Sequence, residues 1–412
     1  MTKGGGMGEK PDKLSTNGGS MRPNAAGRPE AGESRQRVRA SRRVIQVDNF
    51  KSLLVAWIIG CHALVGYTAI GGWPYDEVKE ITMSPGSEFL ISIILGPTAL
   101  FVIGTFFFLA GLFASAEMTH LGPAHFARSR MTRLGLPWLS FTLLVWPLFM
   151  WFAYRSAGHR LSYWQAFLGR QPFLDSGPLW FAQVLMYVSL GYALWRWRKW
   201  GLRFRLRATQ GSHLLLAAVA IAIASFVVRL QFPARSQQIL DLHLWQWPHC
   251  VGMFCLGAAL SRQGWARRVP PGVARKCGIA VIVTLLVAPV LAFVAGVRNF
   301  ARDGDRFLGG WHWEALALDA VEASLVVAGS VWLLAWAQRR LTSDAPILVA
   351  SARGAFAAYM LQVPVLIGLE IAARPLPLPG FVKGVLVGAL AVAGSFWLGW
   401  LLVSRTKLGK IL

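Results

Sequence analysis

The chain has 412 residues, of which 55% are hydrophobic and only 15% are charged, and its mean hydropathy is +0.46. Soluble domains carry about 25% charged residues, so this composition excludes an ordinary soluble enzyme, and the apolar excess excludes a disordered chain. Forty-two Lys and Arg residues against nineteen Asp and Glu residues give a formal net charge of +23. Because the basic residues lie between long apolar runs, they indicate contact with anionic membrane lipids rather than with nucleic acid. The sequence therefore predicts an all-α integral membrane protein.

Residues 1–42 are rich in Gly, Ser, Asn, Pro and Arg and contain few large apolar side chains. Such a segment buries too little apolar surface to offset the entropy of ordering, and a disordered basic cytoplasmic tail is predicted. Residues 43–412 are predicted to form one transmembrane domain. Apolar runs of about 20 residues can cross a bilayer as helices, and about ten follow one another: 51–71, 88–115, 133–154, 178–197, 212–230, 244–262, 277–297, 312–337, 345–372 and 381–404.

The orientation of these helices follows from the basic residues between them. With the N-terminus in the cytoplasm, most Lys and Arg residues fall on the cytoplasmic side, including the basic segment 196–207. This distribution agrees with the positive-inside rule and predicts that both termini are cytoplasmic in a multi-pass protein of the inner (plasma) membrane. The four cysteines form no CxxC pair and show no metal-ligand spacing, so no metal site is predicted.

The first predicted helix carries polar residues in a position where they are costly. An ionisable side chain near the bilayer centre costs roughly 2.5–3.5 kcal/mol on insertion scales. Lys51 and His62 are separated by about 16 Å of helix and about 20° of azimuth, and Asp48 lies within about 40° of the same face. This face suits an anionic ligand that enters from the cytoplasm and reaches His62 with its reactive end. The alternative is a structural histidine in an interhelical hydrogen bond, beside a snorkelling lysine.

Two other groups of polar residues are candidates for binding. Arg130 and Arg133 lie three residues apart at the cytoplasmic end of a helix, a spacing that suits phosphate binding, although positive-inside anchoring explains it as well. Trp180 follows a Gly-Pro break and is a candidate for lining a cavity, whereas most of the tryptophans are expected at the membrane interfaces.

The eighth predicted helix contains two carboxylates, Asp319 and Glu322, on one face. In an apolar setting two such groups raise each other's pKa. They either line an acceptor cavity, orient His62 or hold a proton, or they pair structurally with Arg229 or Arg298. The sequence leaves these alternatives open.

Six motifs in chain order resemble the membrane acyltransferase-3 family. They are Arg43-x4-Asp48-x2-Lys51-x10-His62, Phe107-Phe108-Leu-Ala-Gly111, Arg130-x2-Arg133-Leu-Gly-Leu-Pro137, Leu179-Trp180-Phe181, the stretch 247–257 that follows Arg229, and Tyr359-Met-Leu-Gln362-Val-Pro364. The resemblance covers residues 43–404. Lys51 replaces the family's usual arginine, Ala110 its usual serine, and Gln362 stands where many members carry histidine.

The resemblance implies an O-acyltransferase that moves a short acyl group, of acetyl or succinyl type, from cytoplasmic acyl-CoA to a hydroxyl of an extracytoplasmic glycan or glycolipid. Acyl-CoA is then a co-substrate, and no permanently bound cofactor is expected. His62 is implied as the catalytic residue, acting as a general base or through an acyl-imidazole. The residues implied to bind the donor are Arg43, Asp48, Lys51, Arg130 and Arg133.

The acceptor side is assigned to Trp180, Asp319 and Glu322 as cavity-lining residues. Two other classes of function are open alternatives. The first is a transporter or flippase for a polar or lipid-linked metabolite, which intramembrane carboxylates would serve. The second is a membrane scaffold recruited through the basic tail.

Overall fold

The computed structural model of the chain describes residues 44–68, 73–78, 80, 83–170, 172–198, 211–236, 238–296 and 304–411. The predicted tail and Arg43 lie outside these residues. The regular structure of the described residues is entirely helical, as the sequence predicted. Eight helical segments are long and apolar enough to cross a membrane.

The first of the eight segments is the part of α3 (Pro85–Leu121) from Ile94 onward. The others are the run from α4 (Pro123–Arg130) to α6 (Trp146–Ser156), α8 (Trp180–Trp197) with the preceding turn η4 (Gly177–Leu179), α9 (Gly211–Arg229), α11 (Pro271–Val294), the run from α14 (Trp313–Ser324) to α15 (Ser330–Arg340), α16 (Pro346–Ala373) and α17 (Gly380–Arg405). The last three segments begin and end within about three residues of the predicted spans, because charged or proline residues bound their apolar runs.

The other two predicted spans, 51–71 and 244–262, contain helices that are not among the eight segments long and apolar enough to cross a membrane. Helix α2 (Ile45–Val65) begins six residues before the predicted start, because its buried face extends through Val47 and Phe50 into the polar segment. Helix α10 (Trp247–Leu260) has 14 residues, fewer than the approximately 20 that a bilayer requires. It continues at both ends into short 3-10 turns, η6 (Leu244–Gln246) and η7 (Ser261–Gln263).

Two π-helical turns widen the segment between α4 and α6. They are η2 (Met131–Gly135) and η3 (Phe141–Val145), and they flank α5 (Leu136–Ser140). Proline follows each of them within two residues, at Pro137 and Pro147. A proline has no N–H to donate and clashes with the carbonyl four residues back, so the preceding turn opens into π geometry.

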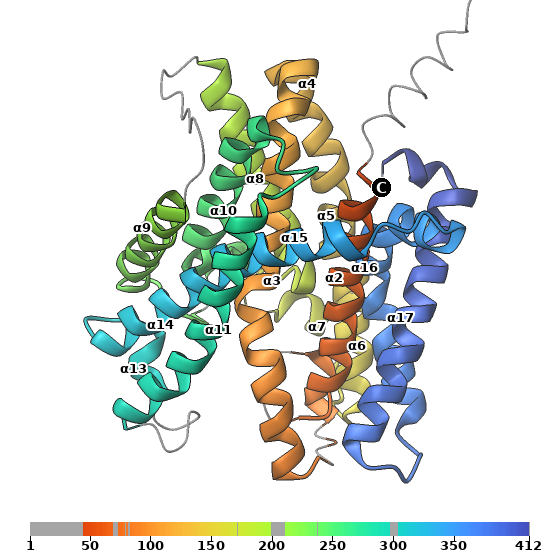
Figure 1. Cartoon of the computed structure of the whole chain (residues 1–412). Helices are drawn as coiled ribbons and strands as arrows, with labels where there is room; N and C mark the ends of the chain where they lie inside the picture. Colours follow the sequence, from red (N-terminus) through yellow and green to blue (C-terminus); the bar gives the residue numbers. More distant parts are fainter. Residues whose placement is uncertain are drawn as a thin grey trace, which may run out of the picture. The chain divides into compact units, whose positions relative to one another are not determined.

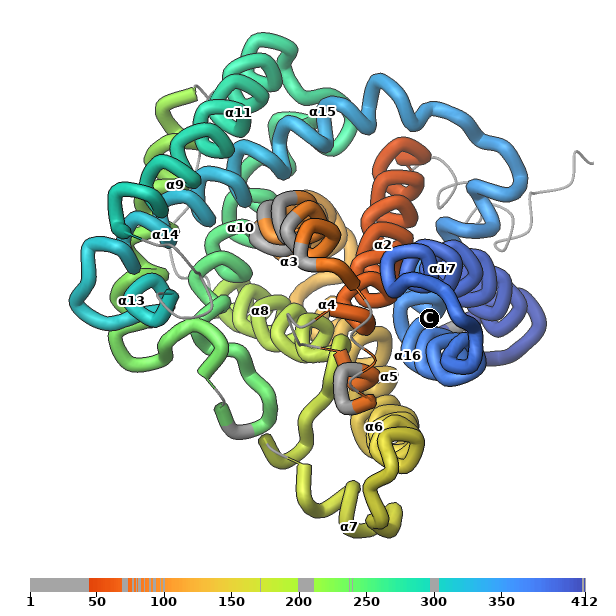
Figure 2. Tube along the Cα trace, turned by 90° about the horizontal axis from the view of Figure 1, so that it is seen from below, coloured from red at the N-terminus to blue at the C-terminus, as the bar shows by residue number. Residues whose placement is uncertain are grey.

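Helix α2 packs against α16 and α17, and α3 packs along α10 (Figure 1, Figure 2). The crossing of α3 and α10 depends on two glycines. A Cβ at Gly111 would overlap the carbonyl oxygen of Phe254, and a Cβ at Gly257 would overlap that of Phe108. Two of the family-like motifs therefore meet here as a close helix crossing. This crossing positions α3 beside α2.

Candidate active site

His62 lies one turn before the C-terminal end of α2 and contacts α16. Its Nδ1 is 2.9 Å from the side-chain oxygen of Gln362. The Gln362 amide nitrogen donates to the carbonyl oxygen of Tyr359 at 2.9 Å, so the amide oxygen faces the imidazole. An amide oxygen only accepts hydrogen bonds, and Nδ1 must therefore carry the proton. The lone pair of the neutral ring is left on Nε2.

The face of the imidazole is held by Trp73. The two rings stack with centroids 4.6 Å apart and an angle of 16° between their planes. The Trp73 indole N–H donates to Glu370 at 2.9 Å, and Glu370 is fully buried on α16. His62 remains partly exposed, and its Nε2 makes no hydrogen bond to any residue that the structure describes. The ring is thus fixed at Nδ1 and on one face, while Nε2 is open.

Tyr359 connects this centre to the beginning of α8. Its hydroxyl donates to the carbonyl oxygen of Pro178 at 2.6 Å, and its ring lies edge-on to Phe181 at 4.9 Å. Pro178 belongs to η4, so Trp180 stands two residues further along the chain. The Gly-Pro break before Trp180 is visible in the sequence. In the structure, the Pro178 carbonyl oxygen at this break joins the start of α8 to α16.

Trp180, Asp319 and Glu322, which the sequence assigned to the acceptor side, belong to one series of contacts. Trp180 stacks on His243 with ring centroids 4.4 Å apart, and His243 lies 6.1 Å from the ring of Trp245. The guanidinium carbon of Arg229 lies 5.4 Å from the centre of the Trp245 ring. The sequence did not single out His243 or Trp245, because their contacts are with residues on other helices, Trp180 and Arg229.

Arg229 completes the series by binding both carboxylates. It donates to Asp319 at 2.6 Å and to Glu322 at 2.5 Å, and its side chain is 1% exposed. Asp319 is fully buried. Of the alternatives left open by the sequence, pairing with Arg229 is the one that the structure shows; a part in lining an acceptor cavity stays a prediction.

The predicted donor residues lie at the other end of α2. Lys51 is 3.8 Å from Asp48, and its ammonium group lies 5.0 Å above the ring of Phe113 on α3. One turn later on α3, Glu117 accepts a hydrogen bond from Arg130 at 2.5 Å. The structure therefore brings Asp48, Lys51 and Arg130 to the same end of the helices.

The other two residues assigned to the donor site, Arg133 and Arg43, are not shown to join this group. Arg133 is exposed, and Arg43 is outside the described residues. The sequence also missed Glu117, which neutralises part of the positive charge of Arg130.

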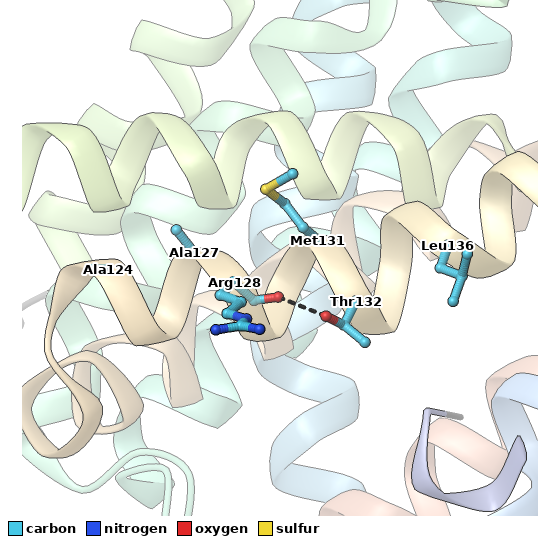
Figure 3. A pocket seen from close by; sticks show the side chains of 6 residues that line it. All are labelled: Ala124, Ala127, Arg128, Met131, Thr132 and Leu136. Atoms are coloured by element: carbon cyan, nitrogen blue, oxygen red, sulfur yellow. Dashed lines mark hydrogen bonds between the residues drawn. The ribbon is translucent and has the colours of Figure 1, made fainter. Parts of the chain in front are cut away.

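A shallow surface groove of 520 Å³ lies along α4 and the π-helical turn η2 (Figure 3). Its lining is mostly apolar, with Arg128 and Thr132 as the polar members, and the Thr132 hydroxyl donates to the Arg128 carbonyl oxygen at 3.0 Å. By helical geometry Arg130 points roughly to the opposite face of the same helix. The groove is thus separate from the donor residues and does not include His62.

These features define a multi-pass membrane protein with a histidine-centred polar site. The chain belongs to the acyltransferase 3 family: the family's model, described as an acyltransferase domain, matches residues 44–403. Comparison with curated proteins and with solved structures found no match. The chain is therefore an acyltransferase that transfers groups other than aminoacyl groups, as the resemblance predicted. Membership of this family also argues against the transporter and scaffold alternatives.

Proposed function

We propose that the protein moves a short acyl group, of acetyl or succinyl type, from cytoplasmic acyl-CoA to a hydroxyl of an extracytoplasmic glycan or glycolipid. In this proposal it lies in the inner (plasma) membrane with both termini in the cytoplasm. The observation that carries it is the state of His62, whose proton is held on Nδ1 by Gln362 while Nε2 stays open.

His62 acts as a general base in the proposed reaction. Its Nε2 accepts the proton of the acceptor hydroxyl as the oxygen attacks the thioester carbonyl, and the C–S bond breaks. The imidazolium then returns the proton to the thiolate of CoA, so atoms and charge balance. The hydrogen bond from Nδ1 to Gln362 orients the ring and supports its positive charge between the two steps, as a third group does in catalytic triads.

The basic end of α2 suits the donor. Acyl-CoA carries several phosphate charges. Lys51, near the beginning of α2, and Arg130, at the end of α4, both lie beside the C-terminal part of α3 and could bind them. About 16 Å of helix separates Lys51 from His62, so a pantetheine arm entering between the helices would bring its thioester toward the imidazole. Asp48 and Glu117 set the position of these cations and limit the net charge at this end.

Lys51→Gln is expected to raise the KM for acetyl-CoA about tenfold, because a charge-assisted hydrogen bond to phosphate contributes roughly 1.5–3 kcal/mol and tenfold corresponds to about 1.4 kcal/mol. Lys51→Arg keeps the charge and serves as the matched control. The measurement is initial rate against acetyl-CoA concentration for purified protein. An unchanged KM in Lys51→Gln would remove Lys51 from the donor site.

Gln362→Leu is expected to lower kcat roughly 100-fold without changing the KM for acetyl-CoA, because it removes the group that keeps the proton on Nδ1. Gln362→Glu keeps an oxygen at the same position and should retain more activity than the leucine variant. The comparison requires kcat and KM for both variants. Equal rates in the two variants would show that hydrogen bonding to Nδ1 is unimportant.

The function itself is tested on cells with and without the protein. Mass spectrometry of their purified surface glycans should find an acyl mass increment that is present only when the protein is made. Re-expression of the wild-type chain should restore the increment. Identical glycan masses in the two strains, with the protein present in the membrane, would contradict the proposed function.

A further inference from the structure

The segment between α9 and α10 places a second imidazole beside a carboxylate. Nδ1 of His243 lies 2.9 Å from the backbone oxygen of Asp241 and 3.1 Å from its carboxylate oxygen Oδ1. The backbone oxygen only accepts hydrogen bonds, so Nδ1 carries the proton and Nε2 carries the lone pair. Nε2 makes no hydrogen bond within the part of the chain that the structure describes. His243 is partly exposed and stacks on Trp180, which is also partly exposed.

The backbone that presents His243 is strained. Leu240, Asp241 and His243 have φ values of 60°, 54° and 47°, in the left-handed region that side-chain-bearing residues rarely adopt. Each such residue costs on the order of 1–3 kcal/mol, and strained residues cluster where a ligand is held. Three such residues lie within four positions, so contacts from the surrounding structure must hold this backbone in place.

Side chains from both sides of the segment maintain this conformation. The indole N–H of Trp247 donates to the carbonyl oxygen of Leu242 at 2.7 Å, and the Gln238 side chain accepts from the backbone N–H of Leu244 at 3.0 Å. Ser176, beside η4, donates to the carboxylate of Asp241 through its backbone N–H at 3.3 Å and its hydroxyl at 3.4 Å. The segment is thus tied to the chain just before α8.

We propose that His243 and Trp180 form the subsite for the acceptor and bind a neutral, hydroxyl-bearing sugar unit. This inference rests on the proposed function. The open Nε2 accepts a hydrogen bond from a sugar hydroxyl, and the exposed part of the Trp180 ring contacts the apolar C–H face of the same sugar. His243 is a positioning residue in this account, because it holds the acceptor and takes no part in the proton transfer at His62.

The carboxylate of Asp175 lies close to the subsite and disfavours an anionic ligand. Asp175 accepts hydrogen bonds from the Trp146 indole at 2.7 Å and from the Gly177 backbone at 2.7 Å. Burial, together with the neighbouring Asp175 carboxylate, raises the pKa of Asp241 to about 8. Burial also lowers the pKa of His243 below its ordinary value, which keeps the imidazole neutral and able to accept a hydrogen bond at physiological pH.

The subsite is connected to the catalytic centre by the beginning of α8. Trp180 follows Pro178, whose carbonyl oxygen binds the hydroxyl of Tyr359, and Tyr359 in turn holds the amide of Gln362 against His62. A sugar placed on Trp180 would therefore be held by the same rigid set of residues that orients the base. This supports a role in presenting the acceptor.

The test uses His243→Asn in the purified full-length protein, because asparagine tolerates the left-handed backbone conformation and preserves the loop. The acceptor is surface glycan isolated from cells that lack the protein, and the donor is acetyl-CoA. We expect the KM for glycan to rise about tenfold, the equivalent of one hydrogen bond of about 1.4 kcal/mol. The kcat and the KM for acetyl-CoA should stay within about twofold of wild type. His125→Asn, at an exposed position of α4, is the matched control.

Trp180→Leu, which removes the stacking face, should show the same selective rise and carries the test if His243→Asn does not fold. An unchanged KM for glycan in the folded variants would overturn the proposal. A parallel loss of kcat and of affinity for both substrates would overturn it as well, since it would indicate only structural support. The proposed function fails in a different way, namely if the wild-type protein transfers no acyl group to the glycan.

Discussion

His62→Ala is expected to lower acyl transfer at least about 100-fold, because a positioned general base contributes roughly 10²- to 10⁴-fold to a rate. The variant removes the Nε2 lone pair, which has no hydrogen-bond partner among the described residues while Gln362 and Trp73 hold the ring. Acyl content of surface glycan, measured per amount of protein in the membrane, is the first readout. Steady-state kcat of the purified variant is the second.

The control for this variant is His125→Ala, which removes a histidine from an exposed position of α4 and should leave activity unchanged. Thermal unfolding of the purified protein checks that the His62 variant is folded. Wild-type acylation by a folded His62→Ala protein would contradict the assignment of the base.

Arg229→Met is expected to destabilise the protein by about 3–5 kcal/mol, because removal of one partner from a buried ion pair leaves the other charge unpaired. Here two carboxylates, Asp319 and Glu322, would be left in a setting where Arg229 and Asp319 are at most 1% exposed. Arg229 joins the end of α9 to α14, so its loss also releases the contact beneath Trp245. The expected observation is a large fall in the unfolding midpoint.

The matched control is the triple variant Arg229→Met, Asp319→Asn, Glu322→Gln, which removes all three charges together. Removal of all three charges together avoids the cost of an unpaired buried charge, so the triple variant should unfold well above Arg229→Met. Equal midpoints for the two proteins would show that unpaired charge is not the cause. The activity of the folded triple variant then reports whether the two carboxylates serve the acceptor side beyond their pairing.

The sequence predicted the helices well where an apolar run ends at charged residues, as in α16 and α17. It was less accurate at α2, whose first turn combines Asp48 and Asn49 with the fully buried Val47. The mean hydropathy of this turn is low because polar and apolar residues alternate in it, although its apolar face packs in the core. The predicted helix did, in contrast, correctly contain both Lys51 and His62, while their common face stays a prediction.

The site itself was only partly predictable. Spacing within one helix made His62 a candidate, and the family resemblance implied its catalytic role, which stays a prediction. Its partner Gln362 is 300 residues away in the sequence, and hydropathy does not report such a contact. Gln362 stands where many members of the family carry histidine, so the resemblance implied no role for it. His243 was missed because its orientation depends on a left-handed backbone conformation, which no local sequence pattern predicts.

The donor end shows the same limit. Periodicity and charge indicated Arg130 as a cation for phosphate, but not that Glu117 would bind it at 2.5 Å. The two residues belong to different helices separated by the turn at Gly122. Electrostatic pairing between helices depends on how they cross, which the sequence alone did not fix.

In the proposed reaction one imidazole, that of His62, serves a donor from one side of the membrane and an acceptor from the other. The most direct measurement uses proteoliposomes that contain the purified protein and enclose the isolated surface glycan, with labelled acetyl-CoA added outside. We expect the enclosed glycan to become labelled and His62→Ala to abolish the label. Labelling only when donor and glycan are on the same side, or equal labelling by His62→Ala, would contradict it.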